Sequence, residues 1–185
     1  MQDEIVFRFL DEGVAAPARL LREQAPETCG AVLDALPAAG SARHGIFSGS
    51  EVYLVLPALL SPPREHATTI VWPGDVGFLT VMKGSGYGIE EDYSEVCWFY
   101  DLDATPSMPE GPLAVNVFAR LYDADAFFAV CRRMRLEGAK RVEISRAERG
   151  SSADEGVGCV TVVRRGHGRR RSVCRASGTR SRSVQ

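Results

Sequence analysis

The sequence predicts a mainly β protein whose sheet closes into a barrel and which also contains two α-helices. Many short segments are rich in β-branched and aromatic residues, and turn-forming Gly, Pro and Asp residues separate them. Only two segments space their apolar residues as an amphipathic helix does. Closure of the sheet is favoured because it removes the exposed edges that many short strands would otherwise leave.

The N-terminal segment predicts a strand hairpin. Residues 5–10 alternate two sets of side chains, Ile5, Phe7 and Phe9 against Val6, Arg8 and Leu10. The Asp-Glu-Gly sequence at 11–13 offers a turn before the segment VAAPARLL. Because Pro17 cannot donate a hydrogen bond to a sheet ladder, the second strand should lie at an edge or be bulged there.

Two segments predict amphipathic helices. The first has Pro26 in its opening turn and stops at Pro37, and its apolar residues at helical spacing are Cys29, Val32, Leu33 and Leu36. The second is capped by Asp123 or Asp125 and runs up to Gly138. Its apolar face consists of Phe127, Val130, Cys131 and Met134.

The remaining segments predict strands and loops. Residues 42–47 and 51–56 are expected to form a hairpin joined at Ser48-Gly49-Ser50. The glycine-rich, acidic residues 83–95 indicate a flexible flap. Further strands are expected at residues 68–72, 73–79, 95–101, 112–122 and 140–148.

Composition divides the chain into a domain and a tail. The 185 residues are 45% hydrophobic and 25% charged, which suits one domain with a sizeable core. Residues 164–185 hold eight arginines and no acidic residue, which leaves 14 basic against 24 acidic residues elsewhere. We predict a barrel domain at 1–149 and a disordered basic tail at 150–185. The tail is the one part expected to meet nucleic acid, unless it is GC-rich DNA read out of frame and not selected.

Several classes of protein and site are not indicated. No apolar run approaches the roughly 20 residues that span a bilayer, and no secretory signal is present, so we expect a cytoplasmic protein without membrane contact. The five cysteines are scattered without a CxxC pair, which indicates reduced thiols and no zinc site. The GSGYG segment lacks the Lys-Ser/Thr of a phosphate-binding loop, so no nucleotide cofactor is expected. Nothing in the sequence indicates an oligomeric state.

The order of these elements resembles a family of bacterial proteins labelled as a domain of unknown function. The likeness covers roughly residues 4–148, and its segments are PETCGAVLDALP, SGSEVYLVLP, EVCWFY and, most specifically, PGDVGF and VNVFAR. The resemblance implies a closed, cyclophilin-like barrel of about eight strands with helices capping its ends, and no known reaction. True cyclophilins use an arginine near a Phe-x-x-Gln segment, which this chain lacks. A residual prolyl isomerase or a peptide-binding module is the alternative to small-molecule binding.

The hairpin at 42–56 contains the candidate catalytic residues. If Gly49 and Ser50 form a two-residue turn, Ile46 pairs with Tyr53, and strand alternation places His44, Ile46, Glu51, Tyr53 and Val55 on one face. His44 and Glu51 would then suit acid–base chemistry, with Tyr53 in contact with a ligand. A metal would need a further ligand such as His66 or Asp75, so no metal site is predicted. The alternative is an exposed polar face of a hairpin.

Three residues outside this hairpin are candidate ligand contacts at the mouth of the barrel. Trp98 shares a face with Tyr100 in EVCWFY, although core packing also explains a large apolar strand. Asn116 and Arg120 share a face with Phe118 in VNVFARLY, and an arginine there could bind a carboxylate. Together they predict a small polar or anionic ligand, unless that face simply points outward.

Overall fold

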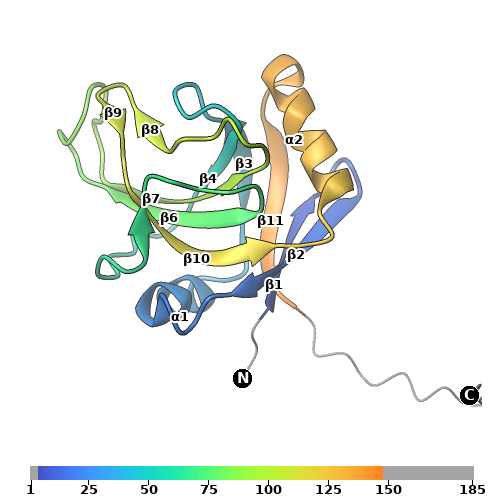
Figure 1. Ribbon diagram of the computed structural model, residues 1–185, viewed down its shortest axis with the longest axis horizontal. Helices are drawn as coiled ribbons and strands as arrows, with labels where there is room; N and C mark the ends of the chain where they lie inside the picture. The colour runs from blue at the N-terminus through green and yellow to red at the C-terminus, as the bar shows by residue number, and fades with distance from the viewer. Residues whose placement is uncertain (1–3, 148–185) are drawn as a thin grey trace, which may run out of the picture. The chain divides into compact units, whose positions relative to one another are not determined.

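Eight antiparallel strands close into a barrel in the computed structural model, which describes residues 4–147 (Figure 1). The strands follow the order β2-β1-β11-β3-β4-β7-β6-β10, and β10 pairs with β2 to complete the ring. The predicted mainly β barrel with two helices is confirmed. Its strands are β1 (Glu4–Phe9), β2 (Val14–Leu20), β3 (Ala38–His44), β4 (Glu51–Val55), β6 (Asp75–Val81), β7 (Tyr93–Phe99), β10 (Val115–Leu121) and β11 (Lys140–Arg146).

Three shorter strands and two helices lie outside the ring of eight strands. Strand β5 (Ala67–Thr68) pairs with β10, and β8 (Ser107–Met108) and β9 (Gly111–Pro112) form a small hairpin of their own. The helices are α1 (Pro26–Asp34) and α2 (Asp125–Glu137), close to their predicted positions. The strand expected at residues 68–72 is reduced to β5. The predicted tail at 150–185, with its arginines, lies outside the described residues.

The core fills the barrel interior and extends under both helices. In β1 the predicted alternation places Ile5, Phe7 and Phe9 inside with no solvent exposure. Phe7 and Phe9 pack with Phe127 of α2 around Trp98, with ring centroids 4.5 to 6.4 Å apart. Burying large aromatic side chains supplies much of the apolar free energy of a small barrel.

Strand β2 is not the edge strand that Pro17 predicts. It pairs with β1 along its length, Pro17 included, and it also closes the barrel against β10. The β10 pairing involves only Ala18, Arg19 and Leu20, so Pro17 lies just beyond the point where that ladder ends. The missing N–H of a proline is tolerated where no ladder partner needs it.

The N-terminus of α1 is capped by a residue that is distant in the sequence. Glu65 accepts hydrogen bonds from the backbone N–H groups of Glu27 and Thr28, at 3.1 and 2.8 Å, and from the Thr28 hydroxyl at 2.8 Å. These donors have no partner within the helix, and a carboxylate complements the positive end of the helix dipole. The loop that follows β4 is thereby tied to α1.

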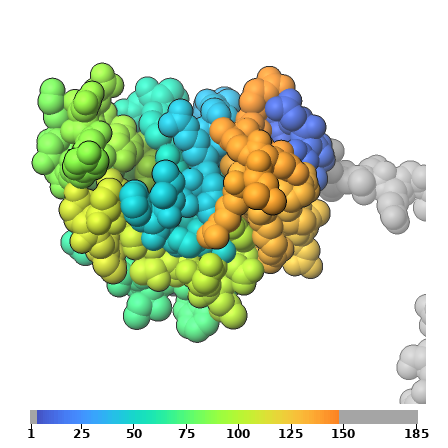
Figure 2. All heavy atoms as spheres, turned by 90° about the horizontal axis from the view of Figure 1, so that it is seen from above, coloured from blue at the N-terminus to red at the C-terminus, as the bar shows by residue number. Residues whose placement is uncertain are grey.

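Two loops lie together on one side of the barrel. The flap at residues 83–92 contacts the β8–β9 hairpin, because Tyr87 N–H donates to Glu110 Oε1 at 2.6 Å. Both segments appear at the upper left of Figure 1, in green and yellow-green. In Figure 2 the 45–50 loop (cyan) lies between this flap (green) and α2 (orange) on one face of the molecule.

Candidate functional site

The hairpin between β3 and β4 has a different register from the predicted one. Arg43 lies opposite Tyr53, and His44 lies opposite Val52. Since opposite residues of an antiparallel pair share a face, Arg43 lies on the same side as Tyr53 and Glu51. His44 lies on the other side. The predicted grouping of His44 with Glu51 and Tyr53 is therefore wrong.

A longer connection than the predicted tight turn causes this change. Residues 45–50 join the strands, and Ser48 is held by Ser107 of β8: its Oγ accepts from Ser107 N–H at 3.0 Å and donates to Ser107 O at 3.1 Å. Gly49 has a φ of 71°, and a Cβ there would collide with the carbonyl oxygen of Asp103. The loop is shaped by contacts with a distant segment, which local turn rules do not include.

The outer face of β4 and β7 forms the floor of a groove of about 510 Å³, which we call the carboxyl groove. Glu51 and Glu95 contribute its two acidic side chains, and the flap and the β8–β9 hairpin contribute to its walls. Other side chains that line it are Arg43, Ile46, Phe47, Ser48, Tyr53, Val55, Tyr87, Ile89, Tyr93, Ser107, Met108 and Pro109.

Burial changes the acidity of both glutamates. It raises the pKa of Glu51 to about 7, although interaction with the Ser48 side chain opposes the change. Burial, together with repulsion from Glu51, raises the pKa of Glu95 to about 8. The Tyr93 phenol beside them follows the same rule, because burial and the charge of Glu95 raise its pKa to about 12. A carboxyl removed from water favours its neutral form.

The two carboxyl groups can therefore act as hydrogen-bond donors as well as acceptors near neutral pH. A protonated carboxyl donates one hydrogen bond, whereas an ionised one only accepts. Within residues 4–147 the Glu95 carboxyl has no hydrogen-bond or ion-pair partner, and its oxygens remain accessible from the groove. Interacting carboxyls with raised pKa values in a cleft are typical of binding or acid–base sites.

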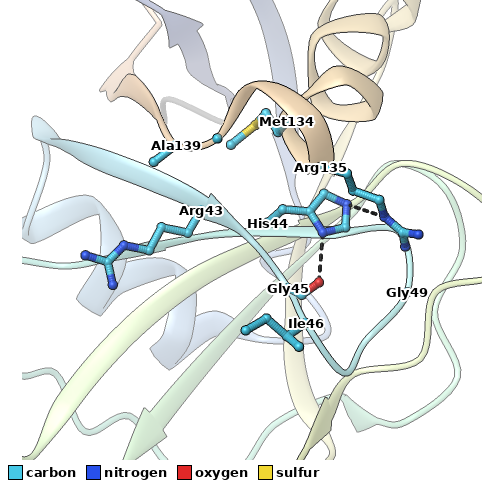
Figure 3. A pocket seen from close by; sticks show the side chains of 9 residues that line it. Arg43, His44, Gly45, Ile46, Gly49, Met134, Arg135 and Ala139 are labelled. Atoms are coloured by element: carbon cyan, nitrogen blue, oxygen red, sulfur yellow. Dashed lines mark hydrogen bonds between the residues drawn. The ribbon is translucent and has the colours of Figure 1, made fainter.

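His44 lies in a separate hollow, which we call the basic pocket (Figure 3). This pocket of about 600 Å³ lies between the end of β3 and the end of α2. The imidazole accepts at Nε2 from the Tyr100 hydroxyl at 2.6 Å and from Arg135 Nε at 3.2 Å, and its Nδ1 donates to Gly45 O at 2.8 Å. Burial, and then the charge of Arg135, lower the pKa of His44, so it is neutral at pH 7.

Trp98 belongs to the core and does not line either hollow. Its side chain has no exposure, and its Nε1–H donates to Cys131 Sγ at 3.3 Å. The ring packs between the aromatic residues of β1 and Phe127 of α2. Its predicted position at a ligand site is wrong, because the inner face of β7 is filled by α2 and not open to solvent.

Asn116 and Arg120 lie on opposite faces of β10. The register against β6 shifts between Val117 and Ala119, so a bulge at Phe118 reverses the alternation. Asn116 Nδ2 donates to Thr28 Oγ1 at 3.0 Å and to Pro63 O at 2.8 Å, and Oδ1 accepts from Glu65 N–H at 3.2 Å.

Arg120 points outward instead and pairs with Asp75, at 2.8 Å from Nε and 2.7 Å from the terminal nitrogen Nη2. Asp75 Oδ2 in turn accepts from the backbone N–H of Trp72. Arg120 thus stabilises the turn that precedes β6, and Asn116 joins α1 to the loop after β4. Neither lines the two pockets described above.

Sequence reasoning missed Glu95 and Arg43, which both line the carboxyl groove. A signal for Glu95 exists in the sequence, since it is the one charged residue in the run EVCWFY. It shares its face with Cys97 and Phe99, so an acid there had to be either buried or placed in a cleft. Arg43 carries no comparable signal.

Residues 4–147 contain neither a metal-binding cluster nor a membrane-spanning helix. No group of three or more His, Cys, Asp and Glu side chains in this range is placed to hold a metal ion. Neither of the helices in the same range combines the length and apolar character needed to cross a membrane.

Solved structures of similar fold include two with a TM-score above 0.5. The solution structure of the hypothetical protein AF2241 from Archaeoglobus fulgidus is 23% identical, with a TM-score of 0.51 over 79% of this chain and 95% of that one. The structure of McbB in complex with tryptophan is 13% identical, with a TM-score of 0.54 over 79% of this chain and 45% of that one. The Mimivirus cyclophilin is 11% identical, with a TM-score of 0.44 over 79% and 88%.

The sequence comparisons agree with the predicted resemblance to a family without a known function. No curated protein matches this sequence. A family model described as "Protein of unknown function (DUF3830)" matches residues 9–146, which is most of the chain. The match runs from the last residue of β1 to the last residue of β11, and so covers the barrel except for most of β1. The chain therefore belongs to the DUF3830 family of proteins of unknown function.

Proposed function

We propose that the protein binds a small organic molecule in the carboxyl groove, with an amino group or another hydrogen-bond donor of the ligand against Glu51 and Glu95. The observation that carries this proposal is the Glu95 carboxyl, which is largely buried, lines the groove, and has no hydrogen-bond or ion-pair partner within residues 4–147. Burial weakens the hydration of such a carboxyl, and a donor on a ligand in the groove would supply the hydrogen bond that the fold itself does not.

The rest of the groove suits the apolar part of such a ligand. Tyr53, Tyr93 and Val55 form an apolar floor beside the acids, and the flap adds Tyr87. Small-molecule sites commonly combine apolar walls with a few polar groups that fix orientation. An ammonium ion also stabilises the ionised carboxyl pair, whereas a carboxylate ligand would be repelled by it.

This proposal keeps only part of the predicted set of residues. Glu51 and Tyr53 remain ligand contacts, and Glu95 joins them as the main acidic contact. The position of the ligand moves from the barrel mouth to the outer wall of β4 and β7. His44, Trp98, Asn116 and Arg120 lie elsewhere and have no part in it.

Three probes of similar size test the proposal by calorimetric titration of the full chain at pH 7.5. Phenethylamine, 2-phenylethanol and phenylacetate differ in their polar group, and we expect the amine to bind best and the carboxylate worst. Glu95→Gln should weaken amine binding by about tenfold or more, as expected for one lost ionic hydrogen bond. The control Glu143→Gln removes an acid of β11 that is paired with Arg8 of β1. Because these strands do not line the carboxyl groove, the affinity should be unchanged. Equal affinity for amine and carboxylate would sink the proposal.

A peptide is the second candidate ligand, and the rim of the groove favours it. Ile46 and Tyr87 line the groove and are 87% and 85% exposed. A peptide that runs along the groove would cover more of their apolar surface than a small molecule inside it. Exposed apolar side chains at a cleft are typical of protein contacts. An assay that measures isomerisation of a proline-containing peptide, with and without phenethylamine, distinguishes the two candidate ligands. Isomerisation that phenethylamine inhibits would support a peptide as the ligand of the carboxyl groove.

A further inference from the structure

The basic pocket differs from the carboxyl groove in the sign of its charge. Its lining includes two arginines, Arg43 and Arg135, beside the neutral His44, and no Asp or Glu side chain, although the Asp103 carboxylate lies near enough to oppose the lowering of the His44 pKa. The two hollows share the segment that follows β3, since Arg43, Gly45 and Ile46 line both. Figure 3 shows His44 and Arg135 side by side, with Arg43 pointing away along the strand.

Arg135 is the unusual arginine of α2. Its neighbours are neutralised by acids: Arg132 lies 3.5 Å from Asp101, and Arg133 lies 2.6 Å from Glu12. Within the described residues Arg135 has no carboxylate partner, and its hydrogen bond goes to His44. A guanidinium carries five N–H donors, so most of those on Arg135 remain available to a ligand.

The contact with His44 aims these donors into the pocket. The imidazole Nε2 has a single lone pair, which the Tyr100 hydroxyl at 2.6 Å and Arg135 Nε at 3.2 Å share, so His44 engages only the Nε–H of the guanidinium. The terminal nitrogens of the guanidinium then extend past His44 on the side of the pocket where Gly49 lies (Figure 3). A guanidinium held by one edge presents its other edge for bidentate contact with an oxyanion.

We propose that the basic pocket binds a small oxyanion, the phosphate or carboxylate group of a metabolite, with Arg135 as its main donor and Arg43 adding positive charge. The volume of about 600 Å³ accommodates more than the anion alone. The proposal does not rest on the ligand proposed for the carboxyl groove, which has the opposite charge, although Arg43, Gly45 and Ile46 line both hollows.

The test is a titration of the full chain with sodium phosphate and, separately, with sodium acetate, at constant ionic strength set by sodium chloride. The readout is the NMR signal of the His44 imidazole, assigned by comparison with His44→Gln, since the chain has three histidines. We expect a saturable shift with one of the two anions. Saturation by phosphate alone identifies a phosphate ligand, and saturation by acetate alone identifies a carboxylate.

Matched variants on α2 make the test specific. Arg135→Gln should weaken anion binding by about tenfold or more, the effect of one charge-assisted hydrogen bond. Arg133→Gln removes an exposed arginine of the same helix and should leave the affinity unchanged. Glu95→Gln should also leave it unchanged, which separates this site from the carboxyl groove. A shift that does not saturate at constant ionic strength, or that is equal in both arginine variants, would overturn the proposal.

Discussion

Glu51 and Glu95 lie on either side of the Tyr53–Cys97 pair, on neighbouring strands of the outer wall. Glu51 is opposite Phe99 and Glu95 is opposite Val55 in the β4–β7 ladder. Both acids also line a small cavity beneath the β8–β9 hairpin, so that segment helps to remove them from water. Two acids are thus buried in one region, and neither forms an ion pair within residues 4–147, so protonation is the way the folded protein accommodates them.

This pair predicts that the protein loses stability as the pH rises. The pKa of Glu95 is about 8 in the folded protein against an ordinary value of 4.5, so the unfolded chain releases this proton first as pH increases. The contribution is fully present below pH 4.5 and is lost as pH rises through 8. For Glu95 alone we expect a loss on the order of 4 kcal/mol in the free energy of unfolding between pH 5 and pH 9.

Glu95→Gln provides the measurement for this prediction. Glutamine resembles the protonated carboxyl and does not ionise, so the variant should lose less stability between pH 5 and pH 9 than the natural chain. His44, whose lowered pKa has the opposite effect below pH 6.5, cancels in the comparison because both proteins contain it. Parallel pH profiles from urea denaturation would show that Glu95 is ionised throughout.

Asn116 is predicted to contribute to stability and not to ligand binding. The Asn116→Ala substitution removes three hydrogen bonds of a buried side chain. Two of them are donated to Thr28 and Pro63, and one is accepted from Glu65 N–H. We expect a loss of about 1–3 kcal/mol in the free energy of unfolding, because buried partners are left unsatisfied. Affinity for phenethylamine should stay the same, and a variant that kept its stability but lost the ligand would contradict this role.

Local patterns in the sequence were sufficient for much of the fold. The alternation of Ile5, Phe7 and Phe9 reports the inner face of β1 correctly, because one face of that strand is buried along its whole length. The helices follow from Pro26 and from the spacing of Phe127 and its neighbours. In each case the deciding contacts repeat with the period of the element itself.

The candidate site was predicted poorly because distant contacts determine it. The face of His44 depends on the 45–50 loop, whose Ser48 is bonded to Ser107, 59 residues away. The face of Arg120 depends on one extra residue in the bulge of β10. A shift of one residue exchanges the two faces of a strand, so an error in loop length or a missed bulge moves every candidate side chain after it.

Gly77 is predicted to be required by the packing of the outer wall. A Cβ at this position would lie 2.7 Å from Val115 Cγ2 and 2.8 Å from Cys97 Sγ, both on buried residues of the adjoining strands. Gly77→Ala should therefore reduce the free energy of unfolding by about 1–3 kcal/mol through overpacking.

The matched control for this change is Gly30→Ala in α1. A Cβ there meets no atom within 4 Å, and alanine favours a helix by about 0.5–1 kcal/mol over glycine. Denaturation by urea should thus move the two midpoints in opposite directions. If Gly77→Ala left the free energy of unfolding unchanged, β6 and β10 would have to move apart at this position at little cost.

Trp98 is predicted to stabilise the core, and its fluorescence makes the test direct. The chain has two tryptophans, and Trp98 is fully buried while Trp72 is 60% exposed. Trp98→Phe removes the hydrogen bond to Cys131 and leaves a cavity beside Phe7 and Phe127, so we expect a loss of about 1–3 kcal/mol. The remaining emission should be that of a solvated indole, whereas Trp72→Phe should leave blue-shifted emission and nearly full stability. Red-shifted emission in Trp72→Phe would contradict the buried position of Trp98 and with it the packing of α2 on β7.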